Sequence, residues 1–596
     1  MRGRTVRAGR PERRAAVIAL VLLLVTGVFT GRLLQVQALD TGQLAEDALA
    51  ERLAKVTLPA QRGSITDRNG NVLAESVERV NVTANPNLFR GPQPDAKNLW
   101  TAPDAAAALA PLLNVPESEL AAQLAPRDRA DGKPLQYVIL AKRLTPEQWR
   151  AVDALGIPGI FSERAEDRTY PAGTTAGNLV GYVSRDGTAL AGLELAENDT
   201  LSGTDGEQLY EQGRNGQRIP LAGETTTPAV DGKDVRLTLD EDIQFYAQNA
   251  ARAQAEAAEA DWVSVVVMAK DGQVLALAES GSIDPADPGA TPEAERHNRS
   301  LEDTFEPGST GKLITAAAAI QEGLATPETQ LTVPDRLQLP GRAGFVRDSH
   351  PHDLQKLTFA GVLAESSNVG TIEVGQKLTV QQRYDYLRAF GIGQKVLGLP
   401  GETRGILGTP DSWKNDARTP YNVLFGQGYG VNALQAAQVY ATIANGGVRI
   451  PAHVVAGTTD ADGTYTPATP GTGTRVVSEA TAQQVTAMLE GVVTSDGTGL
   501  NAAVPGFRVA GKTGTAQDLP ATRATGTPQY TSSFIGMAPA DDPQLVVAVI
   551  VQHPQTSHYG GTVAAPVFSD VMGYALGKEG ITPSGAPAQL PPLTWQ

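Results

Sequence analysis

The chain has no cysteine and only six histidines among its 596 residues. The absence of cysteine excludes disulfide bonds, a thiolate nucleophile and a cysteine-ligated zinc site. Basic charge is also scarce, because the net charge is −16 at pH 7. This acidic balance argues against nucleic-acid binding, which requires a basic face to neutralise phosphates.

The remaining composition is that of a folded protein, with 41% hydrophobic and 19% charged residues. A chain of this length is too long for one ordinary domain and predicts about two to four.

An apolar run at residues 15–31 is the first feature that predicts a location. Arginines precede the run, at positions 2, 4, 7, 10, 13 and 14, and acidic residues follow it from Asp40 onward. Basic residues before an apolar run and acidic residues after it predict that the N-terminus lies inside the membrane and the body of the protein outside it. As a helix the run is roughly 25 Å long, and apolar residues continue to Leu39 beyond Arg32. We therefore predict a cytoplasmic tail at 1–14 and a transmembrane anchor at 15–39. A signal peptide cleaved after Ala38 is the alternative.

The first half of the body predicts a mixed α+β domain over 40–228. Residues 40–56 have helical spacing, and 62–76 have the pattern of a hairpin that turns at Asn69-Gly70. Helices are expected over 100–126 and 145–155. Turn-forming residues cluster at 214–233 and indicate a boundary.

The second half predicts an α/β domain over 229–576. A strand is followed by a long helix with Asp240 as its N-cap, and then by an apolar hairpin over 262–280 that turns at Asp271-Gly272. The middle is rich in helices, and three strands and a final helix close the domain. A sheet built from both ends of a domain with helices from its middle is a layered α/β architecture. The Pro-rich residues 577–596 are expected to form a loose tail.

The first of three chemical motifs is Ser309-Thr310-Gly311-Lys312, at the start of an apolar helix. Positions i and i+3 share a helix face, so the amine of Lys312 can reach the hydroxyl of Ser309. A serine nucleophile needs an adjacent base, and a lysine serves only when it is neutral. Burial and a second nearby cation would favour the neutral form.

The other two motifs supply groups that suit a peptide substrate. Ser366-Ser367-Asn368 offers a hydroxyl for proton relay and an amide that can hold a peptide. Lys512-Thr513-Gly514-Thr515, predicted to lie in a strand, can hold a carboxylate, and Gly514 leaves room for a ligand beside the strand edge. Each motif alone is common by chance, and serine and asparagine more often form caps and turns. Together and in this order they form the signature of penicillin-binding proteins and class A β-lactamases.

The chain resembles a class B penicillin-binding protein and is most similar to the division-specific FtsI type. The similarity spans roughly residues 15–575. Beyond the three motifs, the segments that carry it are RGSITDRNGNVLA (62–74), RTYPAGTTAGNLVGYV (168–183), GLELAENDTLSGTDG (192–206), LTLDEDIQ (237–244), FGQGYGVNALQAAQVYATIANGG (425–447) and SSFIGMAPADDP (532–543). The resemblance implies a multidomain fold: a single transmembrane helix, an α+β pedestal of the dimerisation type, and a transpeptidase domain like that of serine β-lactamases.

The same resemblance implies a role for each motif residue. Ser309 would attack the D-Ala-D-Ala carbonyl of a stem peptide, with Lys312 as general base and Ser366 passing the proton to the leaving D-Ala. Asn368 would bind the peptide amide, and Lys512 would support the electrostatics. Thr513 and Thr515 would bind the terminal carboxylate beside Gly514. The backbone amides of Ser309 and Thr515 would form the oxyanion hole.

The implied partners are peptidoglycan stem peptides, β-lactams, an FtsW-type glycan polymerase in the membrane and other divisome proteins. No cofactor and no metal are expected, and neither nucleotide nor nucleic acid is an expected ligand. One departure from the family is Gly311, where many relatives have a bulky residue, and a glycine there would loosen the first helical turn by about 1 kcal/mol.

Several rival interpretations stay open. Gly506–Thr513 fits the phosphate-loop pattern, but the segment from Gly514 to Pro520 is predicted not to be the required helix. His350 and His352, with Asp348 and Asp353, suggest a metal site, although a solvated loop is the preferred interpretation. The glycines between 426 and 430 favour a tight turn over a cofactor box. An elongation-type transpeptidase, a serine D,D-carboxypeptidase or β-lactamase, and a non-catalytic divisome scaffold remain alternative functions.

Overall fold

The computed structural model of the chain describes residues 11–35, 37, 52–89, 100–211, 224–585 and 587–596. Contacts between Cα atoms divide the chain into two compact units. One comprises residues 1–61 and 203–231, and the other comprises 62–202 and 232–596.

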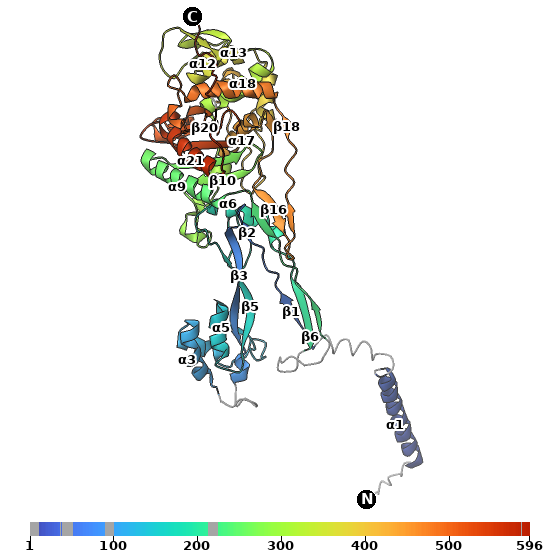
Figure 1. The fold of residues 1–596 in the computed structure, drawn as a ribbon. Helices are drawn as coiled ribbons and strands as arrows, with labels where there is room; N and C mark the ends of the chain where they lie inside the picture. Colours follow the sequence, from blue (N-terminus) through green and yellow to red (C-terminus); the bar gives the residue numbers. More distant parts are fainter. Residues whose placement is uncertain (1–10, 36, 38–51, 90–99, 212–223, 586) are drawn as a thin grey trace. The chain divides into compact units, whose positions relative to one another are not determined.

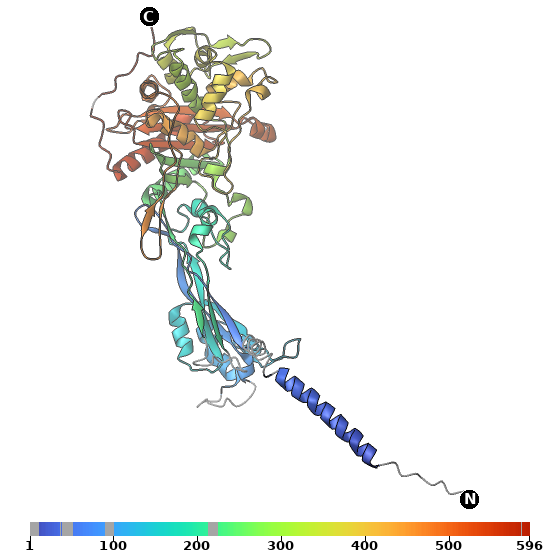
Figure 2. The same ribbon diagram turned by 90° about the vertical axis from the view of Figure 1, so that its right-hand side faces the viewer.

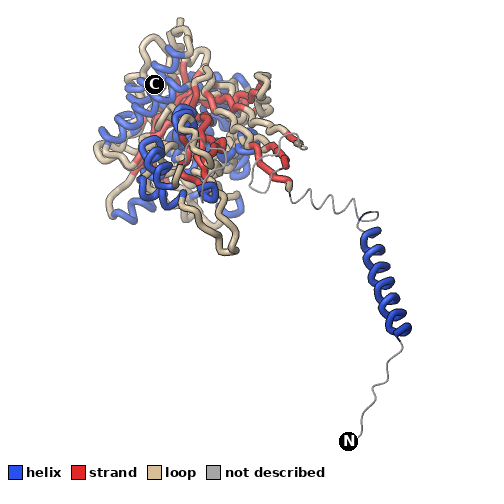
Figure 3. The backbone as a smooth tube through the Cα atoms, turned by 90° about the horizontal axis from the view of Figure 1, so that it is seen from below, coloured by secondary structure: helices blue, strands red, loops and turns tan. Residues whose placement is uncertain are grey.

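Helix α1 (Pro11–Leu34) is one uninterrupted helix of 24 residues (Figure 3). At 1.5 Å per residue it is about 36 Å long, and its apolar side chains are exposed along its whole length. The helix is therefore long and apolar enough to cross a membrane. It begins four residues before the predicted start of the anchor.

A three-stranded antiparallel sheet completes the described part of the first unit. It consists of β1 (Leu53–Leu58), β6 (Gly206–Glu211) and β7 (Thr225–Thr227), in the order β1-β6-β7. The predicted helix over 40–56 is wrong for residues 53–56, because Leu53 pairs with Glu211 and Val56 with Gln208. Pairing with a distant strand overrides local helical spacing here. Residues 40–51 of that prediction lie outside the described residues.

In the second unit, a seven-stranded sheet has the order β17-β16-β8-β2-β3-β4, with β5 also paired to β3. Its strands are β2 (Ile65–Thr66), β3 (Val72–Ala84), β4 (Val138–Leu144), β5 (Ile160–Thr169), β8 (Asp234–Leu237), β16 (Val455–Thr459) and β17 (Tyr465–Pro467). The predicted turn between β2 and β3 is confirmed. Gly70 adopts φ = +91°, and Asp67 accepts backbone hydrogen bonds from Asn69 and Asn71.

Helices α3 (Ala102–Leu113), α4 (Glu117–Leu124) and α5 (Pro146–Asp153) confirm the helices expected over 100–126 and 145–155. Figure 1 shows α3 and α5 beside one end of β3 and β5. Thr101 and Thr145 cap α3 and α5 through side-chain hydrogen bonds. Their apolar faces form a separate core with residues of β3 and β4.

Three segments that carry the family resemblance meet at the buried carboxylate of Glu194. Arg62 and Arg168 each approach it at 2.7 Å, and Glu194 is fully buried. Glu194 belongs to α7 (Gly192–Ala196), which with α6 (Gly177–Val180) and α8 (Asn198–Leu201) follows β5. The two guanidinium groups compensate the cost of burying this carboxylate.

A five-stranded antiparallel sheet organises the C-terminal half, in the order β10-β9-β21-β20-β19. Its strands are β9 (Trp262–Ala269), β10 (Val274–Glu279), β19 (Ala510–Gln517), β20 (Tyr530–Ala538) and β21 (Leu545–Gln552). Helices α9 (Glu241–Ala258) and α21 (Ala565–Lys578) cover one face, and α17 (Ala433–Ala444) packs on the other (Figure 1). The predicted layered α/β architecture is confirmed, as is the Asp240 cap of α9.

The segment between β10 and β19 supplies most of the remaining elements. Its helices are α10 (Arg299–Glu302), α11 (Lys312–Gln321), α12 (Phe359–Ala364), α13 (Asn368–Gly375), α14 (Val380–Ala389), α15 (Pro410–Trp413), α16 (Thr419–Asn422) and α18 (Glu479–Glu490). Its strand pairs are β11 (Gln330–Val333) with β14 (Gln355–Thr358), β12 (Arg336–Gln338) with β13 (Phe345–Arg347), and β15 (Val448–Arg449) with β18 (Thr474–Arg475). Helix α20 (Gly560–Val563) precedes α21.

Helix α19 (Leu519–Thr525) corrects the expectation that no helix begins before Pro520. Its N-cap is Asp518, which accepts a hydrogen bond from the amide of Ala521. The phosphate-loop interpretation still fails, because Lys512 and Thr513 lie inside β19 rather than at a helix N-terminus.

The C-terminal tail is not loose in its last residues. The amide of Thr358 donates to the carbonyl of Leu593 at 3.0 Å, and the amide of Trp595 donates to the carbonyl of Lys356 at 3.2 Å. Figure 2 shows the C-terminus beside the yellow-green elements, where Figure 1 labels α12. These last residues bind backbone groups at the edge of β14 that does not face β11. The composition of the tail could not predict this partner.

Candidate active site

The first motif forms a tight turn at the start of α11. Residues 308–311 form a 3-10 turn in which Gly308 adopts φ = +55°. Lys312 is the first residue of α11 and is fully buried, whereas Ser309 is half-buried. The predicted placement of Ser309 one turn before Lys312 at a helix start is confirmed.

The second motif lies between two helices. Ser366 follows α12 in the left-handed region, with φ = +60°, a conformation that costs a non-glycine residue about 1–2 kcal/mol. Ser367 is the N-cap of α13 and accepts a hydrogen bond from the amide of Gly370. The side-chain amide of Asn368 donates to the carbonyl of Arg347 at 3.2 Å.

The third motif lies in β19, at the edge of the five-stranded sheet. Thr513 shares a hydrogen bond of 2.7 Å with Thr498, and Thr515 accepts one of 3.4 Å from the amide of Gly560. A Cβ on Gly514 would lie 2.3 Å from the Ser533 hydroxyl and 3.0 Å from Thr310 Cγ2. Glycine is therefore required here so that β19 can pack against the Ser309 turn.

The hydroxyl of Ser366 connects the three motifs. It accepts a hydrogen bond of 2.8 Å from Lys512 Nζ and one of 3.4 Å from Lys312 Nζ. Lys312 Nζ also donates to the Ser366 carbonyl at 2.5 Å. Two lysines 200 positions apart in sequence thus present their amines to one serine hydroxyl, next to the turn that carries Ser309.

Burial changes the acid–base properties of both lysines. It lowers the pKa of Lys312 to about 7, while the negative charge of Asp348 acts in the opposite direction. Burial, and next the charge of Lys312, lower the pKa of Lys512 well below its usual value. A fraction of Lys312 is therefore neutral near pH 7, as a lysine base requires.

Asp348 is the residue at this site that sequence reasoning misplaced. The preferred interpretation of its loop was a solvated one, but Asp348 is buried and binds the first amides of α13. One oxygen accepts from the amides of Asn368 (2.5 Å) and Val369 (3.0 Å), and the other accepts from the Ser367 hydroxyl (2.6 Å). Local sequence signals could not identify this role, because Asp348 lies 20 positions before the helix whose amides it binds.

His352 supports the same carboxylate. Its Nε2 lies 3.1 Å from Asp348, and its Nδ1 lies 2.7 Å from the carbonyl of Asp353. His350 instead lies against the ring of Tyr559, 5.6 Å away between centroids. Within the described residues, no three His, Asp or Glu side chains converge as metal ligands.

We expect Asp348→Asn to shift the pH dependence of acylation by a penicillin. Asparagine can keep an oxygen toward the amides of Asn368 and Val369, but it removes a charge that raises the pKa of Lys312. The midpoint of the rate against pH should therefore move to lower pH. The measurement is the acylation rate constant between pH 5 and 9.

Two further variants separate this charge effect from packing. Asp353→Asn changes an exposed carboxylate of the same loop and should leave the midpoint in place. Asp348→Ala should lower the free energy of unfolding by about 1–3 kcal/mol, because buried donors lose their acceptor. An unchanged or higher midpoint in Asp348→Asn would contradict the conclusion that the charge of Asp348 raises the pKa of Lys312.

Comparisons with known proteins show the family to which the chain belongs. The sequence model described as "Penicillin binding protein transpeptidase domain" matches residues 263–573, and that described as "Penicillin-binding Protein dimerisation domain" matches residues 57–237. The chain belongs to the penicillin-binding protein transpeptidase family. Both domains together identify it as a class B member, as the sequence predicted.

Relatives of this penicillin-binding protein cover nearly its whole length. It is 37% identical to penicillin-binding protein PbpB of Mycolicibacterium smegmatis, over 98% of this chain and 92% of that protein. It is 32% identical to peptidoglycan D,D-transpeptidase FtsI of Escherichia coli K12, over 96% of this chain and 92% of that protein. A crystal structure of penicillin-binding protein 3 from Mycobacterium tuberculosis, complexed with aztreonam, has a TM-score of 0.69 at 32% identity, over 91% of this chain and 100% of that chain.

Proposed function

We propose that this penicillin-binding protein is a peptidoglycan D,D-transpeptidase that cross-links stem peptides during septal wall synthesis and is acylated by β-lactams. The observation that carries the proposal is the Ser366 hydroxyl, which two buried lysines approach beside Ser309. Relatives named FtsI and the aztreonam complex of a similar chain support the substrate and the inhibitor class.

Lys312, when neutral, takes the proton of Ser309 as the serine oxygen attacks the carbonyl between the two terminal D-alanines. The carbon–nitrogen bond then breaks, and the departing D-Ala amine receives a proton through Ser366. An amine of a second stem peptide attacks the resulting ester, forms the new amide and releases Ser309. Deprotonation needs an unprotonated lysine, and the pKa of about 7 supports this assignment.

We also propose which residues bind the substrate. We assign Thr513 and Thr515 to the terminal carboxylate, Lys512 to its electrostatic attraction, and Asn368 to the peptide amide. The backbone amides of Ser309 and Thr515 would stabilise the oxyanion. Supporting this, a Cβ on Gly308 would lie 3.2 Å from the Thr515 carbonyl, so turn and strand are in direct contact.

We further propose an orientation, domain limits and partners. The arginines before the apolar run at 15–31 and the acids after it favour a cytoplasmic tail at 1–14, an anchor at 15–39 and an extracytoplasmic body. The pedestal would span 40–228, the transpeptidase domain 229–576 and the tail 577–596. An FtsW-type polymerase and other divisome proteins are the proposed partners.

The decisive test of the reaction is the fate of the acyl-enzyme. The protein is mixed with a D-Ala-terminated depsipeptide or thioester donor and an acceptor amine, and products are identified by mass spectrometry. A transpeptidase yields the amide product in proportion to acceptor. Hydrolysed donor alone, or penicillin released within minutes, would favour a carboxypeptidase or a β-lactamase.

The septal role has a separate test in cells. Depletion of the protein should block division while growth continues, and the wild-type gene should restore division. Loss of cell elongation instead would favour the elongation-type alternative. Restoration by a Ser309→Ala gene would favour the scaffold alternative.

A further inference from the structure

Gly311 has no side chain because another residue occupies the space. Its φ of −71° is accessible to any residue, so backbone conformation does not demand glycine. A Cβ at this position would lie 2.4 Å from the Tyr429 hydroxyl and 2.9 Å from the Cα of Gly426. A larger side chain at position 311 is thus excluded by the atoms that surround it.

The hydroxyl of Tyr429 is a buried polar group without a hydrogen-bond partner among the described residues. The Tyr429 side chain as a whole is almost fully buried. Burial raises the pKa of this phenol, which therefore stays protonated. A buried hydroxyl without a partner is destabilising, so its retention calls for a reason.

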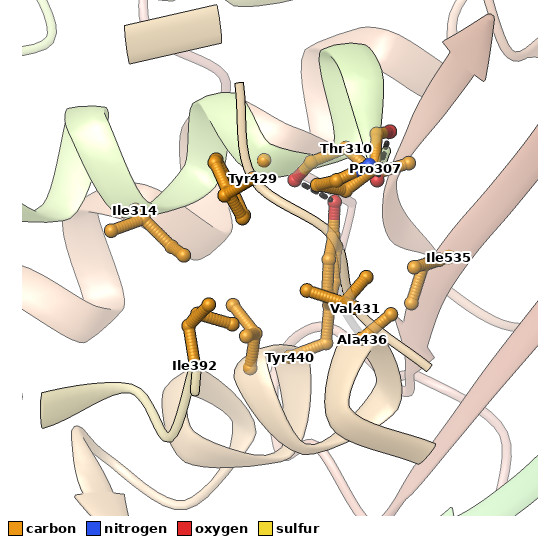
Figure 4. A pocket seen from close by; sticks show the side chains of 11 residues that line it. Pro307, Thr310, Ile314, Ile392, Tyr429, Val431, Ala436, Tyr440 and Ile535 are labelled. Carbon is orange, nitrogen blue, oxygen red and sulfur yellow. Dashed lines mark hydrogen bonds between the residues drawn. The ribbon is translucent and has the colours of Figure 1, made fainter. Parts of the chain in front are cut away.

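The surroundings of Tyr429 lie directly behind the nucleophile turn. Figure 4 shows Tyr429 and Ile314 on one side of a small cavity and Tyr440 and Ile392 on the other. The cavity has a volume of about 10 Å³ and also touches Gly311. Tyr440 differs from Tyr429, because its hydroxyl donates to the carbonyl of Thr310 at 2.9 Å.

The loop at 426–431 runs along the segment that leads into Ser309. Phe305 and Val431 exchange two backbone hydrogen bonds of 2.9 Å, and the amide of Gly308 donates to the carbonyl of Gly426 at 2.8 Å. The amide of Gly428 donates to the Glu306 carboxylate at 2.8 Å. The loop and the nucleophile turn are therefore held together by several hydrogen bonds, and the side chain of Tyr429 lies between them.

We propose that Tyr429 is a positioning residue for Ser309, acting through Gly311. The tyrosine hydroxyl occupies the place of a side chain at 311 and sets how closely the 308–311 turn approaches the 426–431 loop. This spacing fixes the direction of Ser309 relative to Lys312. The proposal rests on the proposed role of Ser309 as nucleophile.

A double-mutant cycle tests the pair. Gly311→Ala introduces the clash and should slow acylation by a penicillin at least about 10-fold, since a small displacement of a reacting group is costly. Tyr429→Phe removes only the hydroxyl and should slow acylation by a few-fold while the melting temperature stays equal or rises. The double variant should acylate faster than Gly311→Ala alone but more slowly than the wild-type protein, because the Tyr429 hydroxyl is absent while the Gly426 Cα still lies 2.9 Å from the added methyl group.

Two controls make the rescue specific. Gly577→Ala adds a methyl group where nothing lies within 4 Å and should leave acylation unchanged. Tyr440→Phe also removes a buried tyrosine hydroxyl near the turn, but that hydroxyl does not face Gly311, so it should not rescue Gly311→Ala. The rate constant is measured per folded molecule and is separated from initial penicillin binding.

A double variant no faster than Gly311→Ala, or equal rescue by Tyr440→Phe, would overturn the proposal. If Gly311→Ala alone does not fold, a double variant that folds and acylates supports the pair, and one that does not fold overturns it. A wild-type protein that forms no adduct at Ser309 would instead refute the proposed function, so the two failures can be told apart.

Discussion

Ser309→Ala is expected to abolish covalent labelling by penicillin. The wild-type protein should gain the mass of one penicillin per chain, and the modified peptide should contain Ser309. The variant should show no mass increase, because the serine oxygen is the atom that forms the ester. Intact-mass spectrometry followed by peptide mapping gives both results.

Ser366→Ala is the matched control for this experiment. It also removes a serine hydroxyl from the site, the one that accepts hydrogen bonds from Lys512 and Lys312. This variant should still form the adduct on Ser309, but more slowly. Labelling that persists in Ser309→Ala, or that maps to Ser366, would show that the nucleophile is misassigned.

Replacing Lys312 with methionine should slow acylation by about 100- to 10,000-fold, the usual contribution of a general base. In the wild-type protein the rate should rise with pH through a midpoint near 7. The sign follows from the chemistry: below its pKa of about 7, Lys312 is protonated and cannot accept the Ser309 proton, and above it the amine is free. The measurement is the penicillin acylation rate constant as a function of pH.

Lys414→Met provides the comparison, since Lys414 is 76% exposed and paired with the exposed Asp411. Its rate and pH profile should match those of the wild-type protein. A Lys312→Met variant that keeps the wild-type pH profile would assign the titration near pH 7 to another group. A rate that falls as pH rises through 7 would contradict the base role outright.

The accuracy of the sequence predictions depended on how local each interaction is. The Asp240 cap, the Asn69-Gly70 turn and the apolar hairpin at 262–280 depend on neighbouring residues, and all are confirmed. The helix over 53–56 and the loose tail were wrong because both segments pair with strands far along the chain. Composition and periodicity hold no information about such partners.

The sequence by itself determined the three motifs, their order, the family they indicate and an apolar helix at the N-terminus. These follow from residue types and short spacings, which the chain displays directly. Only the tertiary structure decided that Lys512 and Lys312 meet at the Ser366 hydroxyl, that burial brings the pKa of Lys312 near 7, and that Asp348 binds the first amides of α13. It also decided why position 311 is glycine. Each of these depends on distances between residues far apart in sequence and on exclusion from water, and both arise only when the separate elements pack together.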